Sequence, residues 1–255
     1  MSSAIAAAEI GLVFALPYEI RPMVDRCRDV RKTIGHRFVL YEGTLGERRL
    51  ALVQAGVGAK RAGAATEALL NGHQPRWIVA AGFAGSLSDE VRTGDLVMAT
   101  EVADESGAVL AIDMRLGSEP ASAAAGEGSR PARVHTGRLL SVDRIIRAAE
   151  EKRAVGIKHA ALAVDMESMA VARVCRDRQV RFLAVRVISD DLSHDLPPEV
   201  LSVLGPSRTF RAGAIVGSLL KRTGAVKDLW RLRKQAKRAA ERLAVFLEGV
   251  IRQLG

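Results

Sequence analysis

The body of the chain repeats one local pattern that few folds accommodate: a short apolar run, a glycine-containing turn and then a helical segment. Short apolar runs bounded by turns are typical of strands buried on both faces. Strands that alternate with helices favour a mainly parallel sheet with helices on both of its sides. The sequence therefore predicts an α/β fold.

The expected strands cover residues 9–15, 37–41, 48–53, 77–81, 96–102, 133–141, 160–164 and 181–188. The first expected helix begins near Pro17, and three more are expected at residues 59–70, 142–153 and 167–177. Glycine-rich segments at 54–58 and 82–86 are each expected to be a turn at the end of a strand. Residues 118–130 are rich in Ser, Ala and Gly and are expected to form a flexible loop.

The composition is that of a folded protein with a sizeable core, since 48% of its 255 residues are hydrophobic. Cys27 and Cys175 are the only cysteines in the sequence, and the first nine residues lack the basic start of a signal peptide. No apolar run reaches the roughly 18 residues that a membrane-spanning helix needs. We therefore expect a protein of the reducing cytoplasm.

The net charge of +9 is concentrated towards the C-terminal end. Residues 206–255 contain 12 Lys or Arg and three Asp or Glu, whereas the other 205 residues contain 26 of each. The sequence therefore predicts a neutral α/β domain at 1–205 and a basic helical extension at 206–255, packed on the same domain. Within the extension we expect two helices, broken at Thr223-Gly224. The second, from about 226 to 254, has an apolar stripe at helical spacing.

Two acidic clusters lie at opposite ends of one helix–strand unit. Asp165-Met166-Glu167 precedes the helix, and Ser189-Asp190 follows the strand. A helix and the strand after it run antiparallel and pack together in α/β folds. Both clusters are therefore expected at one rim of the sheet, where open α/β sheets bind ligands.

Other common site patterns are missing from the sequence. After Gly56-Val57-Gly58, Arg61 replaces the third glycine of a dinucleotide-binding fingerprint, and no Gly-Lys-Ser/Thr phosphate loop occurs. The five histidines are scattered, so no His/Cys cluster has the spacing of a metal site. A Gly-x-Ser-x-Gly nucleophile motif does not occur either. We expect neither a metal nor a cofactor.

In their order along the chain, the motifs resemble those of the nucleoside phosphorylase/nucleosidase superfamily, over roughly residues 9–200. They are Glu19, Gly56-Val57-Gly58, Gly82-Phe83-Ala84-Gly85, Gly94-Asp95, Asp165-Met166-Glu167 and Ser189-Asp190. The chain looks closest to the methylthioadenosine/S-adenosylhomocysteine nucleosidase branch. The resemblance implies a three-layer α/β/α catalytic domain around a central mixed, partly barrel-like sheet. It also implies a purine nucleoside as substrate and assembly into a homo-oligomer, commonly a dimer.

The resemblance implies catalytic roles for three residues. Asp190 would protonate the purine at N7 as the bond to ribose breaks, Glu19 would activate the attacking water, and Arg186 would order the water and the carboxylates. A positioned acid contributes typically ~10²–10⁴ in rate. Carboxylates near the sugar stabilise the positive charge that develops there. Because the acid must carry a proton when it acts, Asp190 needs burial or a neighbouring carboxylate, for which Asp191 is the candidate.

The same resemblance implies the substrate contacts. Glu167 would hold the ribose hydroxyls, Met166 would pack on the sugar, and Ser189 would orient the acid. Ile145 and Ile146 fall where the family contacts the base. An aromatic ring often occupies the first of these positions, so Ile145 would pack on the base without stacking.

The nucleophile is indicated by residues 83–85. Phe83, Ala84 and Gly85 are expected to line the substrate site, and Phe83 stands where the family usually has Ser or Thr beside the water or phosphate. A phenyl ring cannot bind phosphate, and no additional arginine follows the first strand. We therefore expect hydrolysis of the N-glycosidic bond of a 5′-substituted adenosine, releasing adenine. Phosphorolysis by a purine nucleoside phosphorylase is the alternative.

Each of these side chains also has a purely structural interpretation, which the sequence leaves open. Glu19 and Glu167 can complement helix N-termini. Asp190 can cap the segment that follows it, and Arg186 can be a structural ion-pair partner. Their placement in three dimensions separates these alternatives.

The basic extension and Leu196-Pro197-Pro198 resemble a subgroup that acts in hopanoid biosynthesis and removes adenine from adenosylhopane, a membrane lipid. A basic amphipathic arm at 206–255 can hold such an enzyme peripherally on an anionic membrane, at its inner face. Packing of the arm on the body or at a subunit interface is the alternative. Nucleic acid is not an expected partner, because the arm offers only Trp230 and Phe246 for stacking on bases.

Overall fold

The computed structural model describes residues 7–112, 131–196 and 225–254, with side chains in the last range described from residue 235. The strands are β1 (Ile10–Phe14), β2 (Arg28–Ile34), β3 (Val39–Leu45), β4 (Arg48–Gln54), β5 (Trp77–Ser86), β6 (Leu96–Asp104), β7 (Val109–Ala111), β8 (Val134–Ser141), β9 (Ala163–Asp165) and β10 (Arg181–Asp190). The helices are α1 (Pro17–Val24), α2 (Ala59–His73), α3 (Ala149–His159), α4 (Ser168–Asp177) and α7 (Ala225–Gln253).

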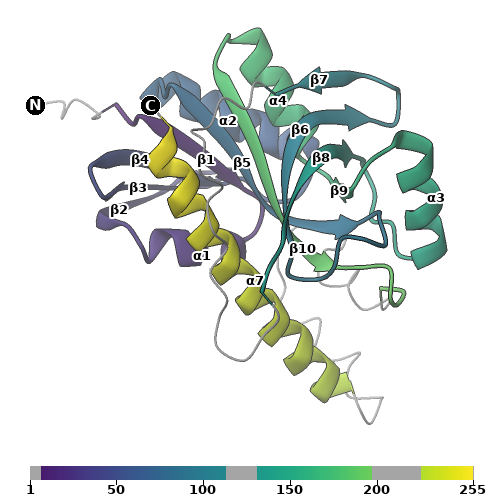
Figure 1. Ribbon diagram of the computed structural model, residues 1–255. Helices are drawn as coiled ribbons and strands as arrows, with labels where there is room; N and C mark the ends of the chain where they lie inside the picture. The colour runs from purple at the N-terminus through teal and green to yellow at the C-terminus, as the bar shows by residue number, and fades with distance from the viewer. Residues whose placement is uncertain (1–6, 113–130, 197–224, 255) are drawn as a thin grey trace, which may run out of the picture.

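The sheet is built around β5. This strand pairs in parallel with β1 on one side and with β10 on the other, and its last residues pair antiparallel with β9. From β10 the pairing continues through β6 and β8 to β9, so these strands and β5 close into a ring. On the other side of β5, β1 leads to β4, β3 and β2. Figure 1 shows the resulting mixed, partly closed sheet, which confirms the predicted α/β fold.

Helices cover both sides of the central strands. α1 and α7 pack against each other on one side, where α7 also contacts β5 and β10 (Figure 1). α2 and α4 pack against each other on the other side, with α2 on β1 and β4 and α4 on β6, β8 and β10. α3 lies at the margin of the ring (Figure 1).

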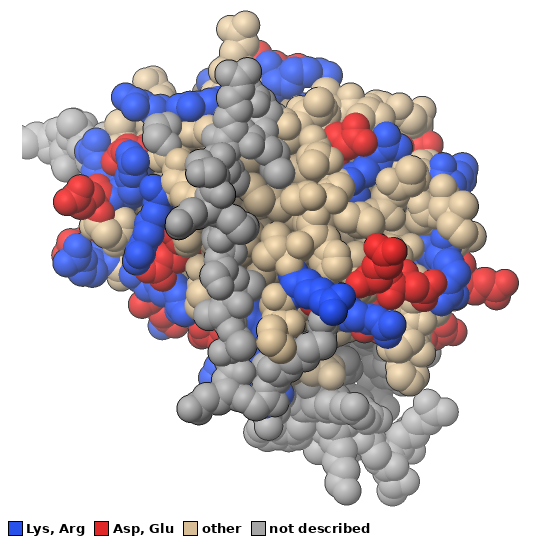
Figure 2. All heavy atoms as spheres, in the orientation of Figure 1, with Lys and Arg blue, Asp and Glu red and all other residues tan. Residues whose placement is uncertain are grey.

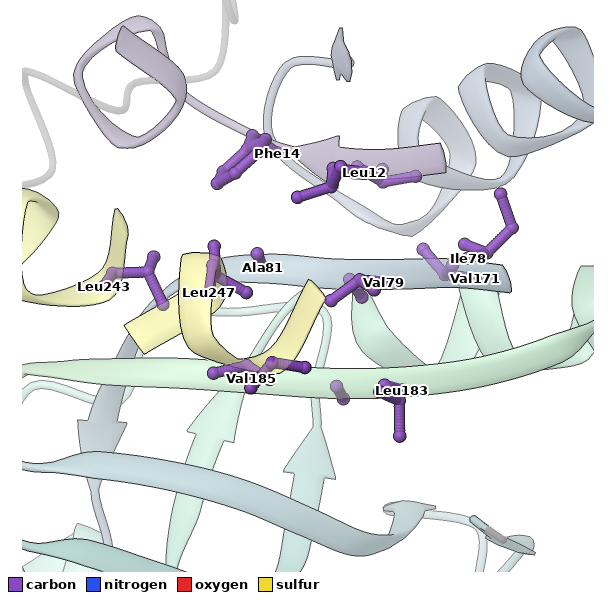
Figure 3. Close-up of a cluster of buried hydrophobic side chains, with 14 of the residues drawn as sticks. Leu12, Phe14, Ile78, Val79, Ala81, Val171, Leu183, Val185, Leu243 and Leu247 are labelled. Atoms are coloured by element: carbon purple, nitrogen blue, oxygen red, sulfur yellow. The ribbon is translucent and has the colours of Figure 1, made fainter. Parts of the chain in front are cut away.

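The hydrophobic core includes the second half of α7. Leu243 and Leu247 lie in one cluster with Ala81 of β5 and Val185 of β10 (Figure 3), and all four side chains are buried. Burying one leucine side chain contributes about 1.5–3 kcal/mol to folding. The end of the basic extension is therefore held on the body by apolar packing.

Polar contacts also fasten α7. Arg26 pairs with Glu241 and Glu248, and Arg242 Nη1 donates a hydrogen bond of 3.2 Å to the Gly94 carbonyl.

Eight of the extension's 12 Lys and Arg residues belong to 206–234, whose side chains are not described. On the face seen in Figure 2, basic and acidic side chains of the described residues are interspersed. Within the described ranges, no helix is both long and apolar enough to cross a membrane.

The prediction of a turn at 82–86 is wrong, because these residues continue β5. Gly82 pairs with Arg186, and Gly85 pairs with both Asp190 of β10 and a residue of β9. Pairing with β10 along this segment, and with β9 at its end, keeps the backbone extended despite the two glycines. The candidate site residues of this segment therefore lie on a rigid strand.

The prediction of a helix at 142–153 is wrong for its first half, since α3 begins only at Ala149. The preceding residues bond instead to the segment after β10. Leu196 N–H donates to the Arg147 carbonyl, and the Arg147 guanidinium donates back to the Leu196 carbonyl. The Ala149 N–H donates to Asp195 at the start of the helix. These long-range bonds hold the backbone outside the helical conformation.

Two strands, β2 and β7, were not predicted from the sequence, and several predictions cannot be compared with the structure. All seven residues of β2 are exposed, so this edge strand has no apolar pattern to identify it. The predicted loop at 118–130, the break at Thr223-Gly224 and the boundary at residue 206 lie outside the described residues.

We predict opposite effects for two glycine-to-alanine changes in helices. A Cβ at Gly156 of α3 would lie 2.2 Å from the Leu87 carbonyl oxygen, whereas one at Gly72 of α2 would meet nothing within 4 Å. Gly156→Ala should lower the free energy of unfolding by about 1–3 kcal/mol through overpacking. Gly72→Ala should raise it by roughly 0.5–1 kcal/mol through helix propensity. Urea unfolding of both variants measures these values, and an unchanged Gly156→Ala would contradict the packing of α3.

Candidate active site

Glu19 is a buried carboxylate surrounded by backbone donors. It lies in the first turn of α1 and accepts hydrogen bonds from the N–H groups of Ala15 at 3.1 Å, Leu16 at 2.7 Å and Phe83 at 2.7 Å. Its residue is 3% exposed, and burial raises its pKa, although these N–H groups and Arg186 act in the opposite direction. A raised pKa suits a group that accepts a proton.

Gly82 lets Glu19 and Arg186 approach each other. A Cβ on this glycine would lie 2.6 Å from Arg186 Nη1 and 2.8 Å from Glu19 Oε1, so any larger residue would displace both groups. The pairing of Gly82 with Arg186 in neighbouring strands brings the guanidinium to this point. A carboxylate and a guanidinium therefore face the same small volume above β5.

Arg186 is fixed by side chains from the β9–α4 connection. It is 1% exposed, and its Nη2 lies 2.5 Å from Asp165 Oδ2 and 2.8 Å from Ser168 Oγ. Asp165 also accepts hydrogen bonds from the Ser141 hydroxyl at 2.5 Å and the Ser168 N–H at 3.1 Å. Among buried side-chain nitrogens and oxygens of the described residues, Arg186 Nε and His73 Nδ1 have no hydrogen-bond partner. The guanidinium is thus fixed on one edge, and its Nε–H remains available to a ligand.

Glu167 completes the cluster from the start of α4. The residue is 8% exposed and accepts hydrogen bonds from the Gly58 N–H at 2.8 Å and the Met166 N–H at 3.3 Å. Burial and then the charge of Asp165 raise the pKa of Glu167 to about 7, while Arg186 and the Gly58 N–H act against them. The glycine turn before α2 therefore serves to hold a carboxylate.

The cluster concentrates negative charge in a buried volume. Glu19, Asp165 and Glu167 are carboxylates, and Arg186 is the cation among them. Such an arrangement favours a positive charge that develops on a bound substrate. In the described part of the chain, no group of three or more His, Cys, Asp and Glu side chains is arranged to hold a metal ion.

Asp190 lies at the end of β10, where the register with β5 shifts. The shift between Ile188 and Asp190 leaves Ser189 as an additional residue, a bulge that redirects the next side chain. The Ser189 hydroxyl donates to Asp190 Oδ1 at 2.6 Å and lies 3.3 Å from the Ala84 carbonyl. A Cβ on Gly85 would lie 3.1 Å from Asp190 Oδ2, so the glycine leaves room for the acid.

Asp190 pairs with Lys152 of α3, a residue to which the sequence gave no role. The Lys152 ammonium contacts Asp190 Oδ2, and the lysine is 1% exposed. The expected carboxylate neighbour, Asp191, turns away and binds Thr93 and Ser193. Burial acts to raise the pKa of Asp191, but these hydrogen bonds outweigh it and lower the pKa to about 2. The structure therefore corrects the expected neighbour of Asp190 from a carboxylate to an ammonium.

Two chemical groups thus lie along one strand pair. Glu19 and Arg186 flank Gly82, and Asp190 flanks Gly85. Three residues of extended chain span about 10 Å. This separation suits a furanose ring with a nucleophile on one side and a purine on the other.

Most of the residues that the sequence singled out lie around this strand pair. Met166 is half-buried beside Glu167, and the Phe83 backbone N–H donates a hydrogen bond to Glu19. Ile146 is buried in a second apolar cluster, and Ile145 is half-buried in the segment before α3. The base contact expected of these isoleucines stays a prediction.

Sequence reasoning missed the roles of Lys152, Asp165 and Gly58. Asp165 stands in the motif that was recognised, but its partner Arg186 is 21 residues away. For Lys152 the available signal is Gly156, four residues later on the same helical face, since a helical glycine often marks close packing. The sequence does not show what that face packs against.

Comparisons with known proteins show the family and the fold. The chain belongs to the Phosphorylase superfamily, whose sequence model matches residues 9–252. The fold and the family together make it an enzyme of the phosphorylase/nucleosidase type.

Its relatives include several nucleosidases. The 5′-methylthioadenosine/S-adenosylhomocysteine nucleosidase of Haemophilus ducreyi is 30% identical over 197 residues, which cover 71% of this chain and 84% of that protein. The structure of the nucleosidase of the same name from S. pneumoniae, with a transition-state inhibitor, has a TM-score of 0.72 at 17% identity and covers 96% and 99% of the two chains. Futalosine hydrolase of Helicobacter pylori has a TM-score of 0.68 at 18% identity, covering 99% and 100%. The last two show that the fold is shared.

We predict that Gly82→Ala strongly lowers activity without unfolding the protein. The added methyl group separates Glu19 from Arg186, so catalysis should fall by about 10²-fold or more, as when a transition-state contact is lost. Gly63→Ala in α2 is the control, because its Cβ would meet only a methyl group at 3.9 Å. Turnover of a nucleoside and the melting temperature of both variants are measured, and full activity of Gly82→Ala would contradict the arrangement.

We also predict a pH-dependent gain in stability for Glu167→Gln. The pKa of Glu167 is about 7 in the folded state, above the ordinary value of 4.5 for a glutamate. The folded state therefore binds the extra proton between these values, and the stability contribution of Glu167 falls as the pH rises through this window. Glutamine removes that loss, so the variant should melt higher than wild type at pH 8.

The expected gain is at least about 2 °C at pH 8, where 1 kcal/mol corresponds to about 2–4 °C for a chain of this size. It should shrink towards pH 4.5, where wild-type Glu167 is largely protonated. Glu47→Gln, in an exposed turn, should show no such dependence. Thermal unfolding across this pH range tests the prediction, and a gain of equal size at every pH would refute it.

Proposed function

We propose that the protein hydrolyses the N-glycosidic bond of a 5′-substituted adenosine and releases adenine. The observation that carries the proposal is the position of Glu19. Its carboxylate occupies the backbone N–H groups of Ala15 and Leu16 at the start of α1, together with that of Phe83. A helix N-terminus of this kind commonly binds phosphate. Here a carboxylate fills it, and its negative charge repels a phosphate nucleophile while it accepts a proton from water.

Water is the nucleophile in this proposal. Glu19 takes a proton from the water as the oxygen attacks C1′ of the ribose. The unpaired Nε–H of Arg186 donates a hydrogen bond to that oxygen and holds it in place. Deep burial of both groups strengthens these interactions, since little bulk water screens them.

The leaving purine takes the electron pair of the broken C1′–N9 bond. Asp190 delivers a proton to N7, so that the base departs as neutral adenine. Ser189 orients Asp190 through its hydrogen bond to Oδ1. Ile145 and Ile146 pack on the base.

The sugar binds between the two groups. Glu167 accepts hydrogen bonds from the ribose hydroxyls, and Met166 packs on the ring. Phe83, Ala84 and Gly85 line the strand beneath it. The negative cluster around Arg186 stabilises the positive charge that the ribose acquires as the bond breaks.

The relatives support the choice of substrate. The Haemophilus ducreyi relative is a nucleosidase named for methylthioadenosine and S-adenosylhomocysteine. Both are adenosines with a substituent at the 5′ position. Removal of adenine from adenosylhopane would be the same reaction with a larger apolar substituent, and phosphorolysis would replace water by phosphate.

We predict that the purified protein releases adenine without added phosphate. The assay follows free base by chromatography from methylthioadenosine, S-adenosylhomocysteine, adenosine and an adenosine with a long apolar 5′ substituent. Glu19→Gln and Asp190→Asn should each lower kcat by about 10²–10⁴-fold. The controls are Glu47→Gln and Asp25→Asn, both at exposed positions.

The outcomes separate the alternatives. A strict phosphate requirement would make the protein a phosphorylase. A preference for the long apolar substituent would favour the lipid substrate. Unchanged turnover in Asp190→Asn would overturn the mechanism.

Three further expectations accompany the proposal as predictions: a homodimer, a cytoplasmic location and peripheral contact of residues 206–255 with an anionic membrane. The membrane contact depends on the side chains of residues 206–234, a segment that contains eight Lys or Arg and one Asp. Co-sedimentation with anionic vesicles at low salt tests this last expectation.

A further inference from the structure

Lys152 is a buried cation that the mechanism above does not use. It lies on α3 with 1% of its surface exposed, and its ammonium contacts Asp190 Oδ2. Lysine is almost never fully buried unless it is paired. Removing a lysine ammonium from water costs several kcal/mol even after relaxation. A side chain held at that cost beside the proposed acid calls for a functional explanation.

Asp190 is the ionic partner of Lys152 among the described residues. The other charged groups nearby bind elsewhere. On α3, Glu151 pairs with Arg144, and Arg153 pairs with Asp89. In the segment after β10, Asp191 accepts hydrogen bonds from Thr93 and Ser193, and Asp195 accepts one from the Ala149 N–H.

The contact is held by the packing of the helix. Gly156 lies one turn after Lys152 and presses on the Leu87 carbonyl, and the Arg153–Asp89 pair joins the same two segments. Asp190 is held from the other side by Ser189. Both partners are therefore fixed, and the proton between them has a short path.

An ion pair places the available proton on the lysine. Asp190, as a carboxylate, has no proton to give to a departing purine. The ammonium of Lys152 has three protons and contacts the carboxylate directly. The pair as a whole can therefore deliver one proton.

We propose that Lys152 supplies, through Asp190, the proton that the leaving purine takes up. This inference rests on the proposed hydrolysis. As the C1′–N9 electron pair moves to the purine, a proton passes from Lys152 Nζ to the Asp190 carboxylate, and Asp190 transfers a proton to N7. Lys152 ends as a neutral amine, Asp190 as a carboxylate and the purine as a neutral base. The lysine regains its proton from solvent after the base has left.

The test compares Lys152→Met with wild type across the pH range. Without the ammonium, Asp190 must take its proton from solvent, which becomes harder as the pH rises. We expect kcat of the variant to be about 10²-fold below wild type at pH 8 and less than about tenfold below it at pH 5. KM should change only a few-fold. Lys158→Met, at an exposed position of the same helix, is the control.

Lys152→Arg provides a second measurement. A guanidinium keeps the positive charge but does not release its proton in proteins. The arginine variant should therefore also lose about 10²-fold in kcat at pH 8. Melting temperatures show whether each variant is folded.

The outcomes distinguish the proposed role of Lys152 from the proposed function. A ratio of variant to wild-type kcat that is independent of pH, or wild-type turnover in Lys152→Arg, would overturn the role of Lys152 while leaving the nucleosidase intact. Failure of the wild-type protein to release a base from any nucleoside would instead overturn the proposed function.

Discussion

The parallel pairing of β5 with β10 is the constraint on which the rest of the structure depends. It sets Gly82 against Arg186 and Gly85 against Asp190, so one register positions both ends of the candidate site. A slip of one residue would turn these side chains to the opposite face of the sheet. The apolar residues of the same two strands, among them Val79 and Val185, are buried between the helix layers and fix the register (Figure 3). Core packing and site geometry are thus specified by the same contacts.

The candidate site lowers the stability of the folded protein, because it keeps ionisable side chains away from water. Glu19, Asp165, Glu167 and Arg186 are all buried, and the pKa values of Glu19 and Glu167 are raised because burial disfavours their charged forms. Backbone N–H groups and the serines around Arg186 offset part of that cost. Apolar packing in the core, which includes the end of α7, compensates for the rest of the free-energy cost of burying these groups. Buried charges that are already in position stabilise a charged transition state. The same burial that lowers the stability of the fold therefore favours catalysis.

The sequence predicted what depends on local pattern. Apolar runs located the central strands, and the order of acidic and glycine motifs identified the family and the residues around β5 and β10. Long-range contacts account for the errors. Residues 82–86 have the composition of a turn, but pairing with β10, and with β9 at the end of the segment, holds them in a strand. The segment before Ala149 has a helical composition, but its bonds to Leu196 prevent a helix. For Lys152 the sequence offers only the indirect signal of Gly156 on the same helical face, since the importance of the lysine comes from a partner 38 residues away.

The position of Glu19 links two properties that are usually separate. The same carboxylate that serves as the proposed base also neutralises the N–H groups at the start of α1. In the proposed mechanism, loss of this side chain would do more than weaken water attack, because it would also uncover backbone N–H groups that can bind an anion. If this mechanism holds, the choice between water and phosphate as nucleophile can change through one residue in the first turn of a helix, with the sheet left as it is.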